Sequence, residues 1–426
     1  MEQILQYVWQ HRLWRNEDMV TNDGRRVRVL DPGLLNTDAG PDFFNAKVEI
    51  DGQVWVGNVE IHVRATDWRR HRHDTDTAYD SVILHVVQLD DAPVYRTNGE
   101  RIPQVVLDCS PRFAERLQQL VNDRTVLPCA SQLPSVPAIV VTEWIQALAF
   151  ERLHSKVDRI ATLRDSFAGS WEDVCYVMLA RTLGFGLNSD ALERLARRTP
   201  LKLLHKHSDS ILQLEALLLG QAGLLDANKA NSDKYVEQLT REYAFLANKF
   251  SLKPMEPEAW KMFRIRPQAF PHRRIALLAH YVHDGFNLMH SILEAQGEKQ
   301  LRQLFQVELT GYWERHYTLG KEAPTATRAL SNASIDIVLI NLVAPLYYAY
   351  GSLTGDYLMT DRAIELLESL KPENNAIVAQ FVHAGLRCDD ALTSQALIQL
   401  RKAYCEPRKC IYCRIGHRLL AEAAHK

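Results

Sequence analysis

The sequence lacks an excess of charge of either sign. Its 426 residues include 50 Lys and Arg against 52 Asp and Glu, a formal net charge of −2. This balance excludes a chain-wide basic surface, so any contact with nucleic acid must be local. The glycine-rich and serine motifs of common enzyme classes are also missing, among them the Walker loop, the Rossmann fingerprint, the Gly-x-Ser-x-Gly elbow and His-Glu-x-x-His. Nucleotide hydrolysis, dinucleotide redox chemistry and serine hydrolysis therefore lose their usual support.

Long uninterrupted apolar runs are scarce as well. The first residues, MEQILQYVWQHRLWRNED, mix charged with apolar side chains and lack the apolar core of a secretory signal. The longest apolar run, from Ile335 to Tyr350, is interrupted by Asp336, Asn341 and Pro345 and is too short to cross a bilayer comfortably. We expect a buried helix there, and a cytoplasmic protein with no membrane partner.

Cysteine is present in an odd number, seven, which argues for reduced thiols and against a disulfide framework. Three of the seven crowd near the C-terminus as Cys405-x4-Cys410-x2-Cys413, followed by His417. This spacing suits a zinc site that His417 completes. An iron–sulfur cluster, with a fourth thiolate from Cys388 or Cys129, is the rival, and free thiols at the start of a helix are the third possibility. The other cysteines are scattered, at positions 109, 129, 175 and 388.

Two patterns divide the chain at a connector rich in proline, LPCASQLPSVP, residues 127–137. Residues 1–126 show short strands and turns, whereas residues 138–404 follow helical spacing almost throughout. The segment 405–426 carries the cysteines and one more helix. The sequence therefore predicts an α+β protein in which a small N-terminal mixed β-sheet module precedes a large all-α domain.

A hairpin around Asp51-Gly52 is the clearest strand signal. A two-residue loop would pair Ile50 with Gln53 and, farther out, Phe43 with Glu60. One face of this hairpin is too polar for a plain core, with Asn58, Glu60, His62 and Arg64 in a row. The opposite face is apolar and should pack on the rest of the module through Phe44, Ala46, Val48, Ile50, Trp55, Val59, Ile61 and Val63.

Two carboxylates can meet on the polar face. Asp42 lies just before the first strand and Glu60 early on the second, an arrangement that suits Mg²⁺ or Mn²⁺. His62 is placed to join the coordination or to accept a proton from water. Strict alternation would point Asp42 to the face opposite Glu60, so this prediction requires an irregular backbone near Pro41. A solvated polar hairpin without a metal is the alternative.

Positive charge collects directly after the hairpin, in RATDWRRHRHDTDTAYD. Its arginines can bind phosphates, and Trp68 or Tyr79 can stack on a base. Alternatively, His62, His71, His73 and Asp76 form a zinc site, or the segment is a solvated turn whose charges pair among themselves. His85, inside an apolar run, is expected to be a core histidine. The arginines of this segment that can bind phosphates are Arg64, Arg69, Arg70 and Arg72.

A second basic stretch, MFRIRPQAFPHRR, precedes a helix. Phosphate contact near the N-terminus of that helix is one interpretation. Pairing of the arginines with acids between packed helices is the other, and the neutral charge of the chain favours it.

The order Pro41-Asp42, hairpin, Glu60-x-His62 resembles the restriction-endonuclease-like PD-(D/E)xK superfamily. The resemblance implies a nuclease-like module that binds Mg²⁺ through Asp42 and Glu60. His62 stands where the superfamily has the lysine that positions or activates the attacking water. Some DNA-repair and CRISPR-associated nucleases of this superfamily hold an iron–sulfur cluster with one upstream and three C-terminal cysteines. The layout of Cys129, Cys405, Cys410 and Cys413 looks like theirs.

Nearly the whole chain resembles an uncharacterised bacterial family, typical of Bacteroidetes and labelled domain of unknown function 2851. The segments that carry this resemblance include NTDAGPDFFNAKVEI, GNVEIHVRATDW, AYDSVILHVV, RPQAFPHRRIALLA and YCEPRKCIYCRIGH. Membership implies no particular reaction.

The leading functional hypothesis is a Mg²⁺- or Mn²⁺-dependent nuclease. In it, Asp42 and Glu60 hold the cation, His62 aids water activation, and Trp68 with the arginines binds nucleic acid. A non-catalytic scaffold that binds nucleic acid or protein through a degenerate nuclease core is the first alternative. A zinc-dependent hydrolase that uses His62, His71 and His73 is the second.

Overall fold

The computed structural model describes residues 2–14, 19–108, 110–225, 233–283, 285–324, 326 and 329–424. Cys109 lies outside these residues. The chain forms two compact units. One, here called the sheet unit, comprises Met1–Trp144, His383–Leu386 and Leu400–Lys426. The other, the helical unit, comprises Ile145–Val382 and Arg387–Gln399.

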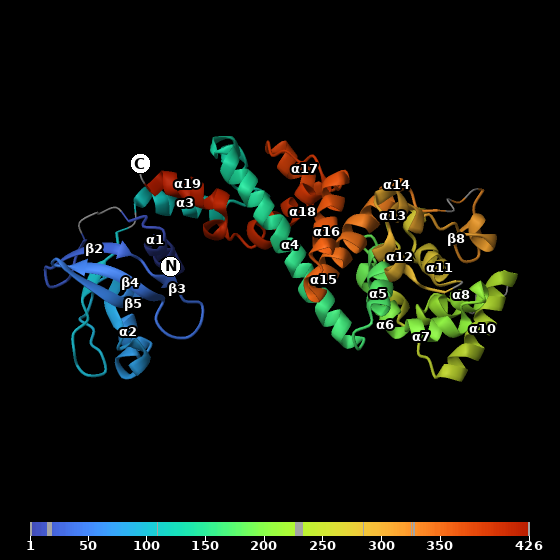
Figure 1. The fold of residues 1–426 in the computed structure, drawn as a ribbon, viewed down its shortest axis with the longest axis horizontal. Coiled ribbons are helices and arrows are strands. Elements are labelled where there is room, and N and C mark those ends of the chain that lie inside the picture. The colour runs from blue at the N-terminus through green and yellow to red at the C-terminus, as the bar shows by residue number, and fades with distance from the viewer. Residues whose placement is uncertain are drawn as a thin grey trace. The chain divides into compact units, whose positions relative to one another are not determined.

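A seven-stranded mixed sheet forms the centre of the sheet unit (Figure 1). Its order is β1-β2-β4-β5-β6-β7, with β3 paired to β4. The pairs β2–β4 and β4–β5 are antiparallel, whereas the pairs β5–β6 and β6–β7 are parallel. The bounds are β1 Met19–Val20, β2 Arg26–Asp31, β3 Leu34–Leu35, β4 Phe43–Ile50, β5 Gln53–Arg64, β6 Val82–Leu89 and β7 Gln104–Val106. The mixed N-terminal sheet expected from the sequence is therefore present.

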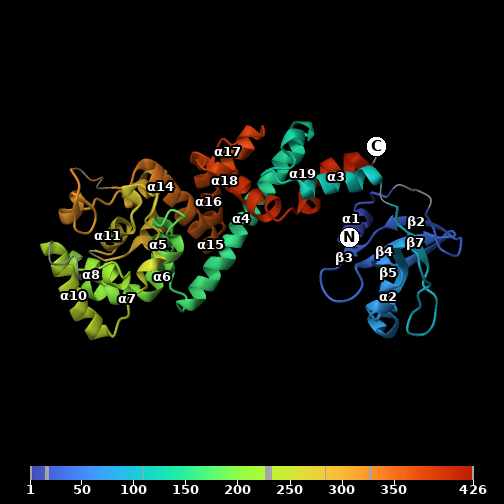
Figure 2. The same cartoon turned by 180° about the vertical axis from the view of Figure 1, so that it is seen from behind.

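Helices complete the sheet unit. Helix α1, Glu2–Gln10, buries Leu5, Val8 and Trp9 against the apolar side of the sheet. Helix α3, Pro111–Asn122, lies beside α19, Arg414–Ala424, in both views of the fold (Figures 1 and 2). The C-terminal helix thus contributes Leu420 to the same core as the N-terminal strands.

Strand β6 is buried on both faces, as its apolar sequence predicts. Val82 to Val87 are all buried, because β6 has parallel neighbours on both sides and apolar clusters above and below. Leu84 and Val86 join the main core of the unit, while Val82 and Val87 pack with Trp68 in a smaller cluster. A strand in this position has a nearly continuous apolar sequence, and His85 is the polar residue among its buried positions.

The β4–β5 hairpin contains a bulge that the sequence-based register does not include. Ile50 pairs with Gln53 as predicted, and the register holds as far as Ala46 opposite Gly57. It then shifts by one residue, so that Phe43 faces Val59 and not Glu60. Asn45 lies in the shift with φ 55°, and its N–H donates to the Asn58 side chain at 3.3 Å. Such a bulge exchanges the faces of every residue beyond it.

This exchange corrects part of the predicted apolar face. Phe43 is fully buried, whereas Phe44, expected inside, is 36 % exposed. Trp55 is also on the surface, at 41 % exposed, for a different reason. Strand β6 pairs with β5 only from Asn58 onward, so the tip of the hairpin extends beyond the covered part of the sheet.

The helical unit is built from helices, apart from a two-stranded sheet of β8, His316–Thr318, and β9, Lys321–Glu322. The domain predicted as all-α is thus helical with this small addition. Helix α4, Ala138–Ser166, enters it from the sheet unit. The further helices are α5 Trp171–Leu183, α6 Ser189–Arg198, α7 Leu201–Leu204, α8 Ile211–Gln221, α10 Lys234–Phe250, α11 Pro271–Val282, α12 Leu288–Glu294, α13 Glu298–Leu304, α14 Asn332–Val338, α15 Ala344–Thr354, α16 Tyr357–Ser369, α17 Ala376–His383 and α18 Ala391–Gln399.

The apolar run noted in the sequence forms one continuous helix, Asn332–Thr354, of 23 residues. By length and composition it is the one helix in the described part of the chain that can cross a membrane, yet 67 % of its apolar window is buried inside the structure. Ile335, Leu339 and Leu346 belong to the core of the helical unit. This burial is that of a core helix and is compatible with a soluble protein.

Candidate metal centre in the sheet unit

The segment after β5 turns His71 and His73 back towards the strand. Helix α2, Asp67–Arg70, forms a single turn that begins where Asp67 accepts the N–H of Arg64 at 3.1 Å. Arg72 then adopts a left-handed conformation, φ 65°, which reverses the chain before the short helix His73–Thr75. His73 stacks on Tyr79, with ring centroids 3.7 Å apart. The loop is therefore a folded element that presents two imidazoles to the sheet.

One ring nitrogen from each of His62, His71 and His73 lies within 4.8 Å of the other two. Nε2 of His62 is 3.1 Å from Nδ1 of His71. The Glu60 carboxylate joins them, with Oε1 at 3.3 Å from Nε2 of His73 and 3.5 Å from Nε2 of His62. Nε2 of His73 is buried and has no hydrogen-bond partner among the described residues. Three imidazoles thus gather at one place, and the Glu60 carboxylate lies beside two of them.

Three of the separations in this cluster suit ligands of one metal ion. Ligand atoms at zinc distances of about 2.0–2.1 Å lie about 3.3 Å from one another at tetrahedral angles. The three measured separations, 3.1, 3.3 and 3.5 Å, lie on either side of that value. The donor set of three imidazoles and one carboxylate suits zinc or another first-row transition ion better than Mg²⁺, which prefers oxygen ligands.

Asp42 stands behind Glu60 and is tied to it through the backbone. The N–H of Asp42 donates to Oε2 of Glu60 at 3.0 Å, and Oδ2 of Asp42 accepts the N–H of Ile61 at 2.9 Å. Its other oxygen, Oδ1, accepts from the Gln6 side chain of helix α1 at 2.8 Å. The two carboxylates predicted from the sequence do lie close together. Asp42 holds Oε2 of Glu60, while Oε1 of Glu60 faces His62 and His73.

The electrostatics of the site favour a bound cation. Burial, reinforced by the charge of Glu60, raises the pKa of Asp42 to about 7. Burial likewise raises the pKa of Glu60 to about 8. Two buried carboxylates that repel each other in this way are neutralised either by protons or by a metal ion. Burial, with the neighbouring imidazoles, lowers the pKa of His62 to about 2, so this ring is neutral, as a metal ligand must be.

His85 on β6 supports His62 from the far side. Nε2 of His85 is 2.8 Å from Nδ1 of His62, and both rings are fully buried. When Nδ1 of His62 carries the proton, it donates to His85 and leaves the lone pair of Nε2 facing the site. The sequence placed His85 in the core, where it is. Its contact with His62 follows from the parallel register, in which Glu60 pairs with His85, and no local pattern predicts that register.

The arginines around the site are exposed. Arg64, Arg69, Arg70 and Arg72 all lie on the surface, as does His71. Arg70 contacts Asp67 at 3.1 Å and approaches Nε2 of His71 at 3.4 Å. Asp76, the fourth residue of the zinc alternative, instead accepts the N–H of Ala78 at 2.9 Å. Arg70 is thus the arginine that contacts the histidine cluster, and the others lie on the same exposed segment.

Trp68 does not share this exposure. Its ring is fully buried, and its indole N–H donates to the carbonyl of Tyr95 at 3.1 Å. The ring packs edge-on against His73 and His85, with centroids 5.3 and 5.2 Å away. Trp68 thus forms the wall of the site, and its ring has no face free to stack on a base.

The cysteines near the C-terminus are brought together with Cys129 in the sheet unit. Cys388 belongs to the helical unit, where its thiol contacts the carbonyl of Asp390. The residue expected to complete a zinc site, His417, has Nδ1 at 2.5 Å from the hydroxyl of Tyr7. The imidazole is thus engaged with helix α1.

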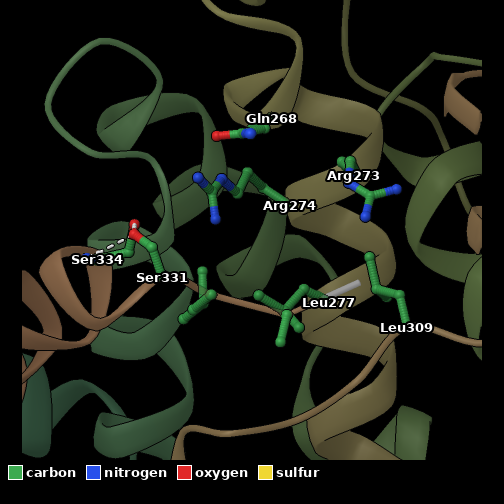
Figure 3. A pocket seen from close by; sticks show the side chains of 9 residues that line it. Gln268, Arg273, Arg274, Leu277, Leu309, Ser331 and Ser334 are labelled. Carbon is green, nitrogen blue, oxygen red and sulfur yellow. Dashed lines mark hydrogen bonds between the residues drawn. The ribbon is translucent and has the colours of Figure 1, made fainter. Parts of the chain in front are cut away.

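The second basic stretch lies in the helical unit and lines a small pocket of about 90 Å³ (Figure 3). Arg273 is buried and donates to the carbonyls of Trp313 and His316 at 2.7 and 2.8 Å. The guanidinium of Arg274 lies over the ring of Phe185, 4.4 Å from its centroid. These contacts are with carbonyls and a ring, in place of the acids that the sequence favoured as partners.

Comparison with known families gives one match. A family model described as "Protein of unknown function (DUF2851)" matches residues 2–376. No curated protein and no solved structure matches the chain.

Proposed function

Because the chain belongs to the DUF2851 family, whose description assigns no activity, we propose a function from the site itself: a metal-dependent hydrolase that cleaves phosphodiester bonds of nucleic acid. The observation that carries the proposal is the cluster of His62, His71 and His73, whose ring nitrogens lie within 4.8 Å of one another, with Glu60 beside His62 and His73 at 3.5 and 3.3 Å. Exposed arginines beside this cluster supply the preference for a phosphate substrate.

This proposal keeps the reaction suggested by the sequence and changes the ligands. The sequence favoured Asp42 and Glu60 as ligands of Mg²⁺ or Mn²⁺. The donor set in the fold favours zinc, with Glu60 and the histidines as ligands and Asp42 as the residue that holds Glu60 in place. A metal ion in such a site polarises a phosphoryl oxygen and lowers the pKa of a bound water.

The protein side chains have separate roles. His85 and Asp42 orient two of the ligands through hydrogen bonds of 2.8 and 3.0 Å. His71 is the exposed ligand, so substrate approaches on its side. Arg69 and Arg72, both exposed on the same loop, bind the flanking phosphates. Trp68 seals the site from behind and excludes water from the buried rings.

The test is cleavage of labelled single- and double-stranded DNA and RNA by the full chain, after chelation and reloading with Zn²⁺, Mn²⁺ or Mg²⁺ in separate reactions. We expect activity with Zn²⁺ or Mn²⁺ and a loss of at least about 100-fold in Glu60→Gln and His71→Ala, because each removes a metal ligand. His205→Ala, which changes an exposed histidine of the helical unit, is the matched control and should leave activity unchanged.

Cleavage that survives both ligand substitutions would refute the proposal, and so would the absence of cleavage with every metal and every substrate. Binding of nucleic acid without cleavage, weakened by Arg69→Ala and Arg72→Ala but unaffected by Arg387→Ala, would instead support the scaffold alternative. Arg387 is an exposed arginine of the helical unit and serves as the charge-matched control.

A further inference from the structure

Four cysteines from distant parts of the chain meet in the sheet unit, apart from the histidine site. Cys129 follows helix α3, whereas Cys405, Cys410 and Cys413 precede helix α19. The four cysteines are neighbours in the fold, since Cys405 lies near Cys129, Cys410 and Cys413, and Cys129 lies near Cys410 and Cys413. Cys129 and Cys410 also pack against the same apolar core.

Hydrogen bonds hold the two segments in register. Arg408 donates to the carbonyls of Asp123 and Thr125 at 2.7 and 2.8 Å. Arg401 donates to the carbonyl of Val126, three residues before Cys129. These contacts join positions almost 300 residues apart in the sequence. They fix the loop that carries Cys129 against the segment that carries the other three cysteines.

The C-terminal segment that carries three of the cysteines is folded into two tight turns. Arg408 has φ 57°, and Lys409 donates its N–H to the carbonyl of Tyr404 at 2.8 Å. A second turn, Cys410–Tyr412, places the N–H of Cys413 at 3.3 Å from the carbonyl of Cys410. A Cβ at Gly416 would lie 2.1 Å from that carbonyl, so a residue without a side chain is required there.

The thiol of Cys413 is buried near the backbone N–H groups of Ile415 and Gly416. N–H groups beside a sulfur atom stabilise the negative charge of a metal-bound thiolate. The indole nitrogen of Trp144 is buried and has no hydrogen-bond partner among the described residues.

We propose that Cys129, Cys405, Cys410 and Cys413 bind a thiolate-coordinated metal centre, either one Zn²⁺ ion or an iron–sulfur cluster. The site is complete with cysteine alone, so His417 is left to its contact with Tyr7. The centre joins α3, α19 and the intervening turns into one block and is independent of the histidine site.

The test uses the full chain, produced anaerobically in cells supplied with iron and zinc. Metal content, acid-labile sulfide and the visible absorption spectrum are measured for the parent, for Cys129→Ser and Cys410→Ser, and for the control Cys388→Ser. We expect one sulfur-bound metal centre per chain in the parent and the control, and its loss in both other variants. Iron with matching sulfide identifies a cluster, and zinc without sulfide identifies a single ion.

X-ray absorption of the parent keeps the test valid if the serine variants do not fold. It should show sulfur neighbours at about 2.3 Å from the metal, which the histidine site cannot supply. A parent with no sulfur-bound metal under these conditions overturns the proposal, as does retention of the centre in folded Cys129→Ser. Neither result bears on cleavage by the histidine site, so the two proposals fail separately.

Discussion

At the residue scale, Glu60 is the side chain on which the histidine site depends. It is almost fully buried, it receives the N–H of Asp42 at 3.0 Å, and its second oxygen faces two imidazoles. Burial raises its pKa from 4.5 to about 8, so without a metal the folded protein keeps a proton there that the unfolded chain loses. The carboxylate therefore couples stability, pH and metal binding.

In the metal-free protein, the stability that protonated Glu60 contributes should fall as pH rises from 6.5 to 8. In this window the folded state binds more protons at Glu60 than the unfolded state, so Glu60 contributes a negative slope of unfolding free energy against pH. Histidines with a lowered pKa, His62 and His85 among them, act in the opposite direction near pH 6.5, so the effect of Glu60 is measured as the difference between the parent and Glu60→Gln. Between pH 6.5 and pH 8, metal-free Glu60→Gln should lose about 2 kcal/mol less unfolding free energy than the metal-free parent. Urea unfolding at each pH measures this difference.

Glu49→Gln, on the neighbouring strand β4, is the control and should follow the parent. Saturating Zn²⁺ should remove or reverse the slope, since a metal binds deprotonated ligands more tightly as pH rises. Equal dependence of stability on pH in the chelated parent and in chelated Glu60→Gln would contradict this account of Glu60.

Trp68 supplies a second prediction at this scale. Because its ring is fully buried and its N–H bonds to the Tyr95 carbonyl, Trp68→Phe should cost about 1–3 kcal/mol of stability. Affinity for nucleic acid, measured by fluorescence anisotropy below the unfolding transition, should not change. Arg72→Ala should instead weaken the affinity for nucleic acid and leave stability unchanged. Weaker binding of nucleic acid by folded Trp68→Phe would contradict this prediction and support the substrate-binding role that the sequence suggested for Trp68.

At the element scale, the bulge in β4 decides which residues share the face of the site. In a regular hairpin, Asp42 would lie opposite Ile61 and face away from the histidines. The one-residue shift between Phe43 and Ala46 brings Asp42 opposite Glu60. The irregularity that the sequence required near Pro41 is therefore found four residues later, at Asn45, where φ is 55°. Asparagine tolerates this conformation better than most residues.

Substitutions at Asn45 should test the bulge. Asn45→Gly keeps a residue that accepts positive φ, so stability and Zn²⁺ affinity should stay close to those of the parent. Asn45→Val places a β-branched residue there and should cost roughly 1–3 kcal/mol. Deletion of Asn45 should restore regular pairing and turn Asp42 away, which weakens Zn²⁺ binding in calorimetric titration. Undiminished zinc affinity in a folded deletion variant would show that Asp42 does not support the site.

At the scale of the whole molecule, the chain leaves the sheet unit and returns to it. Residues 400–426 belong with residues 1–144, although the helical unit lies between them in the sequence. Leu420 is fully buried in the core that also holds Phe113 and Leu120 of α3. The sheet unit is thus incomplete until the last residues of the chain have folded.

Removal of the C-terminal segment should therefore destabilise the sheet unit first. In a chain that ends at Gln399, we expect limited proteolysis to cut within residues 1–144 while fragments of the helical unit persist. Leu420→Ala is the milder change and should cost about 2–4 kcal/mol in unfolding of the sheet unit. A chain ending at Ala424 is the control. Equal protease resistance of the Gln399-terminated chain and this control would refute the prediction.

The sequence by itself determined the local features of this protein. Alternation and the Asp51-Gly52 turn predicted the β4–β5 hairpin and its polar face, and the apolar run at Val82–Val87 predicted a strand buried on both sides. The change to helical spacing after the connector predicted the helical unit. Such patterns are visible because they report burial and turn geometry over a few neighbouring residues.

The tertiary structure decided which distant groups meet. It turned His71 and His73 towards Glu60, placed His85 behind His62, buried Trp68, and joined Cys129 to the C-terminal cysteines. It also placed the bulge that carries Asp42 to the face of Glu60. Periodicity shows that a side chain is buried but not which partner buries it, since a one-residue shift or a single left-handed residue changes the partner without altering the pattern.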